Sequence, residues 1–198
     1  MDKKIEQALM ARIKKGDAVA MNEYGANLYV EGNYQEAQQW YQRAYELGNE
    51  YAMVNLGYIY LYGRTGERDY EKEFNYFSEG ALMDNAQAYY KLGDFYFYGN
   101  FVKQNYRLAF KYYEKAYQVS DFDDNDIAAD INYRLALCYH CGYGVNQDEL
   151  EALRFINTAE SYSYYDRANN KFRWQLLAAK ITKLRTTIIN NLNNKYDY

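Results

Sequence analysis

The chain has 198 residues, of which 49% are hydrophobic and 25% are charged. These fractions lie near the average of globular proteins and exclude an intrinsically disordered or collagen-like chain. The net charge of −4 argues against general nucleic-acid binding. Two counts are unusual, because the chain contains no proline and 27 tyrosines. Since proline interrupts intrahelical hydrogen bonding, its absence favours an all-helical fold.

The sequence also gives an expectation for the cellular location of the protein. Residues 1–7 lack the uninterrupted apolar stretch of a signal peptide, and no segment approaches the ~20 apolar residues of a membrane span. We therefore expect a soluble, cytoplasmic protein that does not bind a membrane; a leader removed before residue 1 stays an open alternative.

The first predicted element is a capping helix within residues 1–16. Ile5, Leu9 and Ile13 lie four residues apart, so a helix places them on one face. This segment directly precedes a series of internal repeats, whose open end it would close.

Four helix pairs are predicted over residues 17–163. The first helix of each pair carries a motif of the form Leu-Gly-x-x-Tyr-x-x-Gly, clearly at 56–63, 92–99 and 135–142 and more loosely at 24–32. Its first small residue is Gly25, Gly57, Gly93 or Ala136, which gives spacings of 32, 36 and 43 residues. One helix pair cannot bury its apolar face alone, so the pairs must stack.

The second helix of each pair has an aromatic or apolar pair with small residues at both ends, except that Glu73 stands at the first position of the second copy. Their spacing of i, i+3, i+4 and i+7 lies on one helical face and permits close helix packing. The four copies run over residues 37–44, 73–80, 109–116 and 152–159.

The last predicted element is a basic amphipathic capping helix over residues 164–192. Its apolar positions alternate in steps of three and four, at Trp174, Leu177, Ile181, Leu184 and Ile188. Residues 167–198 carry a net charge of +6, whereas residues 1–166 carry −10. This basic helix could meet nucleic acid, an anionic membrane or an acidic protein, but we interpret it as a cap with a solvated basic side.

The repeated motif resembles the Sel-one-like repeat (SLR), a subclass of the tetratricopeptide-repeat superfamily. The loop and helix start at residues 142–152 are similar to the family pattern Gly-x-Gly-Val-x-x-Asp-x-x-x-Ala. The first repeat departs from it, because its step from Gly32 to Ala37 is five residues and resembles an ordinary tetratricopeptide turn. The resemblance implies one all-α domain over residues 1–198, a right-handed α-solenoid. It also implies a concave groove that holds another protein, and no catalytic residues.

The repeat frame selects candidate partner-binding residues. If the pairs stack in the usual way, the same offsets on each first helix face the groove. The candidates are Asn22, Tyr29, Tyr58, Tyr62, Tyr90, Asp94, Tyr98, Tyr133 and His140. Such an aromatic groove suits an extended peptide or an inserted protein element. The competing interpretation is that many of these rings fill the core between repeats, and we expect about half to do so.

Two other patterns invite a metal. Cys138 and Cys141 flank His140, but a structural zinc site needs four ligands and the chain has no other cysteine or histidine. The segment 121–126 resembles the start of a calcium loop, yet Asp126 stands where glycine is required and Asn132 where glutamate is required. We expect no metal and no cofactor.

The leading hypothesis is a non-enzymatic protein-binding scaffold or adaptor. Small acidic solenoids of this family resemble some bacterial immunity proteins, so a toxin-neutralising role is the alternative, since an acidic body could cover a basic active site. A hydrolase on the concave face is a third possibility, although no nucleophile–base constellation is visible. The sequence leaves the oligomeric state open.

Overall fold

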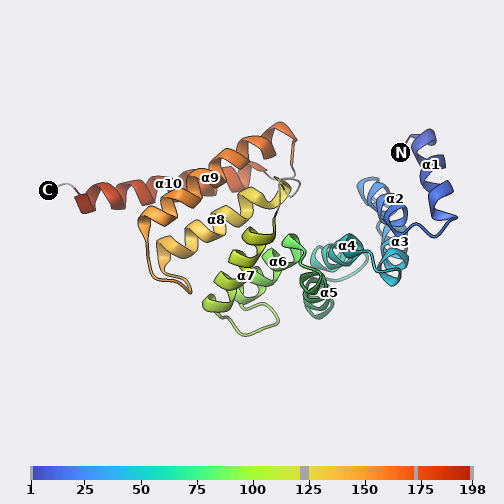
Figure 1. The fold of residues 1–198 in the computed structure, drawn as a ribbon, viewed down its shortest axis with the longest axis horizontal. Coiled ribbons are helices and arrows are strands. Elements are labelled where there is room, and N and C mark those ends of the chain that lie inside the picture. The colour runs from blue at the N-terminus through green and yellow to red at the C-terminus, as the bar shows by residue number, and fades with distance from the viewer. Residues whose placement is uncertain (1, 121–124, 172–173, 197–198) are drawn as a thin grey trace. The chain divides into compact units, whose positions relative to one another are not determined.

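The computed structural model describes residues 2–120, 125–171 and 174–196, and every regular element in them is an α-helix (Figure 1). The helices are α1 (Lys3–Ile13), α2 (Ala18–Val30), α3 (Tyr34–Glu46), α4 (Glu50–Leu61), α5 (Tyr70–Leu82), α6 (Ala86–Tyr98), α7 (Tyr106–Val119), α8 (Asn125–Cys141), α9 (Glu149–Ala168) and α10 (Trp174–Tyr196). Each predicted helix pair corresponds to two successive helices from α2 to α9. The predicted all-α class is confirmed.

In this proline-free chain, the helices begin and end mostly at aspartate, asparagine and glycine residues. Aspartate or asparagine caps the start of most helices; for example, Oδ1 of Asp17 accepts from the backbone N–H of Ala20, and Oδ1 of Asn49 accepts from that of Ala52. Several helices end at a glycine with positive φ, such as Gly48 at 80°. Asx caps and left-handed glycines satisfy the exposed backbone groups that a helix end leaves.

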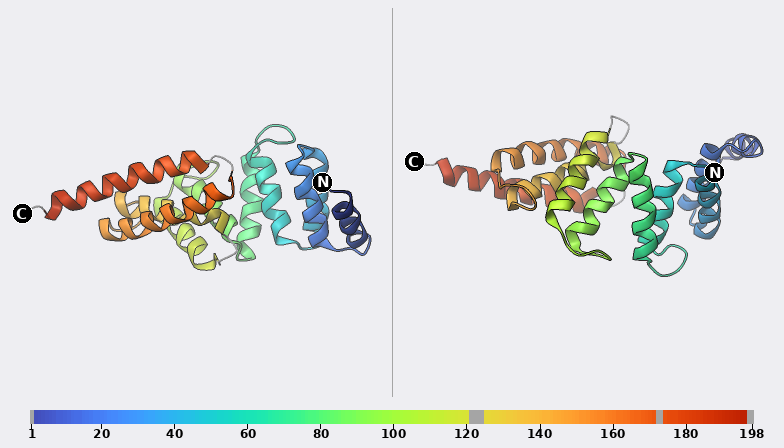
Figure 2. Two further views of the ribbon diagram at one scale, coloured as in Figure 1. Left: turned by 90° about the horizontal axis from the view of Figure 1, so that it is seen from above. Right: turned by 60° about the horizontal axis from the view of Figure 1, so that its bottom comes forward.

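The chain divides into two compact units, Met1–Ala88 and Tyr89–Tyr198, with α6 beginning just before the boundary. In the first unit α2 packs on α3 and α4 packs on α5, and Figure 2 shows these helices side by side. A buried cluster that includes Leu28, Tyr41 and Leu56 holds them together. Leu9 joins the same cluster from α1, while Ile13 is half-buried and Ile5 is exposed.

In the second unit α8, α9 and α10 run side by side (Figure 1). The last repeat helix, α9, continues beyond residue 163 to Ala168, and α10 begins at Trp174. Ile181, Leu184 and Ile188 of α10 are buried. Trp174 and Leu177 are half-buried, so the apolar seam is tightest in the middle of the helix.

The described residues directly after α9 are held by a lysine that lies between two aspartates. Nζ of Lys171 lies 2.8 Å from Oδ2 of Asp130 on α8 and 3.0 Å from Oδ2 of Asp166 on α9. Burial alone would lower the pKa of Lys171, but the two carboxylates outweigh it and raise that pKa. The ammonium therefore stays charged and ties α8 and α9 to the residue that follows them in the chain, Lys171.

A glycine on the first helix of a pair meets a ring on the second helix in three repeats. A Cβ on Gly25 or Gly57 would lie 2.8 Å from the ring of Tyr41 or Phe77, respectively. A Cβ on Gly93 would lie 2.5 Å from Cδ1 of Tyr113. In the fourth pair the corresponding positions are Ala136 and Ile156, both fully buried. The helices thus approach closely because the first one lacks a side chain at the crossing.

Stacked rings flank this crossing. Tyr60 stacks on Tyr76 with ring centroids 5.7 Å apart, and Tyr96 stacks on Tyr112 at 5.5 Å. Tyr139 stacks on Phe155 at 5.6 Å in the last pair. The repetition shows that part of the tyrosine excess serves the scaffold.

We predict that Gly93→Ala destabilises the protein. Alanine gains up to about 1 kcal/mol of helix propensity over glycine. The new methyl group, however, would overlap the fully buried Tyr113 ring, and overpacking costs about 1–3 kcal/mol or more. Gly66→Ala is the control, because a Cβ there meets no atom within 4 Å. Urea unfolding should give a lower midpoint for Gly93→Ala alone; equal midpoints for the two variants would contradict the steric argument.

We also predict that Lys171→Met lowers the free energy of unfolding. The carboxylate of Asp166, whose side chain is 1% exposed, would lose its counter-charge, at an expected cost of roughly 2–4 kcal/mol. The double variant Lys171→Met/Asp166→Asn should regain part of this loss in urea unfolding. No recovery would show that the lysine acts through packing instead of charge.

Candidate functional site

The first unit places an arginine among four tyrosines, here called the Arg64 cluster: Tyr29, Tyr34, Tyr58, Tyr62 and Arg64. Arg64 lies in the loop after α4, and its guanidinium carbon lies 5.6 Å from the ring centroid of Tyr29, 5.0 Å from that of Tyr34 and 5.1 Å from that of Tyr62. Such distances are those of cation–π contacts. Tyr58 extends the cluster, because its ring stacks on Tyr62 at 6.0 Å.

The guanidinium of Arg64 is hydrogen-bonded to an uncharged side chain. Its Nε donates to the hydroxyl oxygen of Tyr29 at 3.0 Å, and this hydrogen bond raises the pKa of Arg64. Within the described residues Arg64 makes no ion pair. Tyr62 is 51% exposed, so the cluster presents a ring and a positive charge to solvent.

The second unit has a related group, here called the Arg134 cluster: Asp94, Phe97, Tyr98, Tyr113, Tyr133 and Arg134. The guanidinium carbon lies 5.4 Å from the ring centroid of Phe97, 5.1 Å from that of Tyr98 and 5.9 Å from that of Tyr133. Arg134 projects from α8 towards α6 and is only 11% exposed. Tyr98, by contrast, is 50% exposed.

The Arg134 cluster contains its own counter-charge. Nε of Arg134 lies 2.9 Å from Oδ1 of Asp94, although without the alignment of a hydrogen bond, and the Tyr113 hydroxyl donates to the same oxygen at 2.8 Å. Burial opposes the charge of Arg134, but Asp94 and the surrounding tyrosines raise its pKa well above the usual range. Burial and the Asp94 carboxylate also raise the pKa of Tyr113, which stays protonated as a donor.

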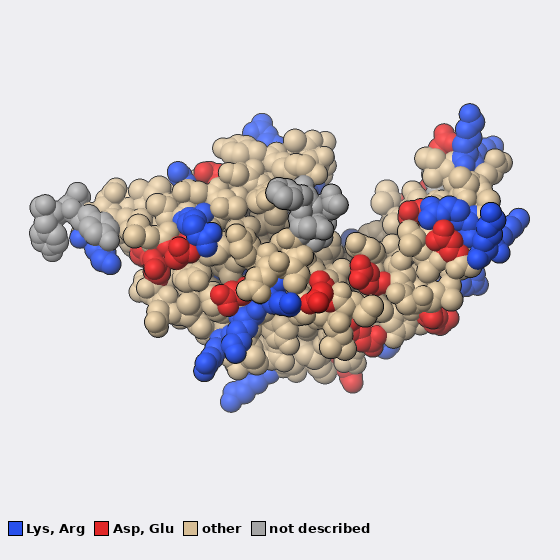
Figure 3. Space-filling model, viewed as in Figure 1, with Lys and Arg blue, Asp and Glu red and all other residues tan. Residues whose placement is uncertain are grey.

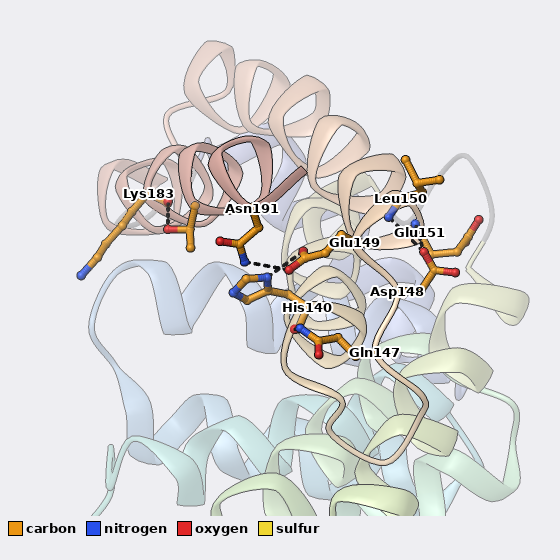
Figure 4. A network of polar contacts seen from close by, with 9 residues as sticks. His140, Gln147, Asp148, Glu149, Leu150, Glu151, Lys183 and Asn191 are labelled. Atoms are coloured by element: carbon orange, nitrogen blue, oxygen red, sulfur yellow. Dashed lines mark hydrogen bonds and ion pairs between the residues drawn. The ribbon is translucent and has the colours of Figure 1, made fainter. Parts of the chain in front are cut away.

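A third polar group joins the ends of three helices in the second unit (Figure 4). Nδ1 of His140 on α8 lies 2.9 Å from Oε2 of Glu149 on α9, and Nδ2 of Asn191 on α10 donates to Oε1 of Glu149 at 2.8 Å. Beside it is a surface pocket of about 500 Å³, lined by Gln147, Asp148, Glu149, Leu150, Asn191, Leu192 and Lys195. We interpret the network as a set of contacts that anchors α10 to α8 and α9.

The structure separates the nine candidate residues into different environments. Tyr29, Tyr58 and Tyr62 meet in the Arg64 cluster, and Asp94, Tyr98 and Tyr133 meet in the Arg134 cluster. Tyr90 is buried against Tyr113, so it belongs to the core. Asn22 accepts a hydrogen bond from Asn55 and links the first helices of two neighbouring pairs. His140 lies apart, in the network with Glu149.

Sequence reasoning missed both arginines. Arg64 lies in a loop, outside the helical offsets that selected the candidates. Arg134 occupies an offset that was not selected, although a charged residue between Tyr133 and the buried Leu135 was a usable signal. Glu149 was also missed, since only the fold brings it to His140.

The two metal patterns have different outcomes. Cys138 is fully buried, and burial raises the pKa of its thiol to about 12, so it is a core residue in the described structure. Across the described residues, no group of three or more histidine, cysteine, aspartate or glutamate side chains could hold a metal ion. The calcium-loop pattern at 121–126 begins outside the described residues.

Two further features concern the charges on the surface and the hydropathy of the helices. On the face in Figure 3, acidic and basic side chains form separate small groups on a largely uncharged surface, with lysine and arginine gathered over α1. None of the described helices is long and apolar enough to cross a membrane.

Known proteins share this architecture. A Sel1 repeat protein from Oxalobacter formigenes is 23% identical with a TM-score of 0.68, over 95% of this chain and 80% of that one. The structure of c5321, a protective antigen of uropathogenic Escherichia coli strains with an SLR fold, is 19% identical with a TM-score of 0.53, over 90% of this chain and 48% of that one. These neighbours confirm the predicted solenoid fold. No curated protein matches the chain at a significant level.

The family follows from the repeats themselves. A family model described as Sel1 repeat matches residues 16–49, 50–85, 86–120 and 129–161, which together make up more than half of the chain. Sel1 repeat proteins generally mediate protein–protein interactions. The first three matched segments contain the helix pairs from α2 to α7, the fourth covers most of α8 and α9, and the chain belongs to the Sel1 repeat family.

Proposed function

We propose that this chain is a non-enzymatic interaction scaffold that binds a partner protein or peptide through the Arg64 and Arg134 clusters. The observation that carries the proposal is the pairing, in each unit, of a half-exposed tyrosine with an arginine at cation–π distance. Tyrosine and arginine dominate the binding energy of many protein interfaces.

The two clusters are suited to recognition because their shapes are fixed before binding. Tyr62 is supported by Tyr58 and Arg64, and Tyr98 is supported by Phe97 and Arg134. A ring that is already held loses little side-chain entropy when a partner covers it. The remaining exposed half of each ring is then available for contact.

We predict that Tyr62→Ala and Tyr98→Ala each weaken partner binding at least tenfold, since truncating an interface hot spot costs ~2 kcal/mol or more. The partner would be captured from a lysate of the source organism with the wild-type chain, identified, and titrated by calorimetry against each variant. Their melting temperatures should change little, because half of each ring already faces solvent.

The matched control is Tyr164→Ala, which removes a tyrosine that is 63% exposed on α9 and belongs to neither cluster. It should bind the partner as the wild type does. If both cluster variants bind normally but melt at lower temperatures, the rings are structural and the proposal is wrong.

A toxin-neutralising role is a second candidate, favoured by the net charge of −10 over residues 1–166. Its partner would be a basic enzyme encoded beside this chain, whose active site an acidic surface could cover. Co-expression should then rescue growth from the toxin, with an affinity that falls steeply as salt rises. A scaffold for a neutral partner would give neither result.

A further inference from the structure

We propose that the Arg64 cluster recognises a single acidic side chain, glutamate or aspartate, within an otherwise uncharged segment of the partner protein. This inference rests on the proposed function and specifies the chemistry of the partner at one of the two clusters.

Equivalent positions on α4 and α6 carry different side chains. Asp94 follows Gly93 on α6, and it neutralises Arg134 within the second unit. The equivalent residue after Gly57 on α4 is Tyr58, which has a ring in place of the carboxylate. Tyr58 stacks on Tyr62 and has an edge contact with Phe77. Among the described residues, no carboxylate pairs with Arg64.

The geometry leaves the terminal nitrogens of Arg64 for a ligand. Nε is occupied by the Tyr29 hydroxyl, while the four N–H groups on the Nη atoms make no hydrogen bond to any described residue. These groups form the planar fork that binds a carboxylate through two parallel hydrogen bonds. The Tyr29 hydroxyl and the three nearby rings hold the fork in place before a ligand arrives.

The surroundings favour one carboxylate over a chain of negative charges. Residues 1–166 carry a net charge of −10, so nucleic acid or a polyacidic segment would meet net electrostatic repulsion from this part of the chain. An isolated acidic side chain gains the contact with Arg64 and avoids most of that repulsion. The exposed face of Tyr62 can cover an apolar residue next to it.

The probe for this proposal is a set of random nine-residue peptides with acetylated and amidated ends, half centred on glutamate and half on glutamine. The peptides are selected on the immobilised full chain, and those retained are sequenced. We expect glutamate-centred peptides to exceed glutamine-centred ones at least tenfold. We expect Arg64→Gln to abolish this excess, and Arg64→Lys to keep only part of it because lysine lacks the planar fork.

The matched control is Arg43→Gln, which makes the same change in net charge on α3, where Arg43 covers Trp40 at 4.6 Å. It should keep the full excess. No excess on the wild type, including a failure to retain any peptide, overturns the proposal, as does an equal loss in Arg43→Gln. A third pool, centred on glutamine with free carboxyl ends, tests the other source of a carboxylate. Preference for that pool over the glutamate-centred one also overturns the proposal.

Failure of this inference can be told apart from failure of the proposed function. If a captured partner requires Tyr62 but binds Arg64→Gln and Arg43→Gln equally, the scaffold role stands and the acidic specificity is wrong. If binding of the partner requires neither Tyr62 nor Tyr98, the scaffold role at these clusters fails as well. Circular dichroism melting of each variant separates loss of recognition from loss of folding.

Discussion

In each of the first three helix pairs, a ring on the second helix rests where the first helix has only a glycine, and this close approach sets the geometry of everything around it. Tyr113 against Gly93 is the tightest case, and its hydroxyl then reaches Asp94 one residue further along. Because the backbones are so near, aromatic rings on either side of the crossing can stack directly, as Tyr96 and Tyr112 do. The residue that follows the glycine, Tyr58 or Asp94, therefore still contacts the ring of the second helix.

The two arginine clusters both combine arginine with tyrosine but differ in what compensates the charge of the arginine. In the second unit a nearly buried guanidinium is balanced by Asp94, as burial of a charge requires. In the first unit Arg64 is half-buried and is held by a neutral hydroxyl. Water can stabilise a cation that is not fully buried, so this cluster needs no internal carboxylate. Both clusters expose a tyrosine, but only in the first is the guanidinium without a carboxylate partner among the described residues.

Most of the fold could be predicted because it depends on spacing. The glycine at the first helix and the ring about twenty residues later recur along the chain, and a recurring interval is visible without a structure. The binding clusters depend instead on which side chains meet across turns and between helices. Arg64 reaches Tyr29 from 35 residues away, and Asn191 reaches Glu149 from 42 residues away. No local period marks such contacts, so sequence reasoning found the rings and Asp94 but missed the two arginines between them.

The tyrosine excess has one physical reason that covers both roles. A tyrosine packs as phenylalanine does, but its hydroxyl can also accept from Arg64, as Tyr29 does, or donate to Asp94, as Tyr113 does. Burial raises the pKa of the interior tyrosines further, for example that of Tyr76 to about 12, so these hydroxyls stay neutral near pH 7. A neutral ring with one polar atom can be buried at a helix crossing or left half-exposed beside a cation. In a tyrosine-rich repeat, a tyrosine can therefore serve either packing or recognition, and the residues around it decide which.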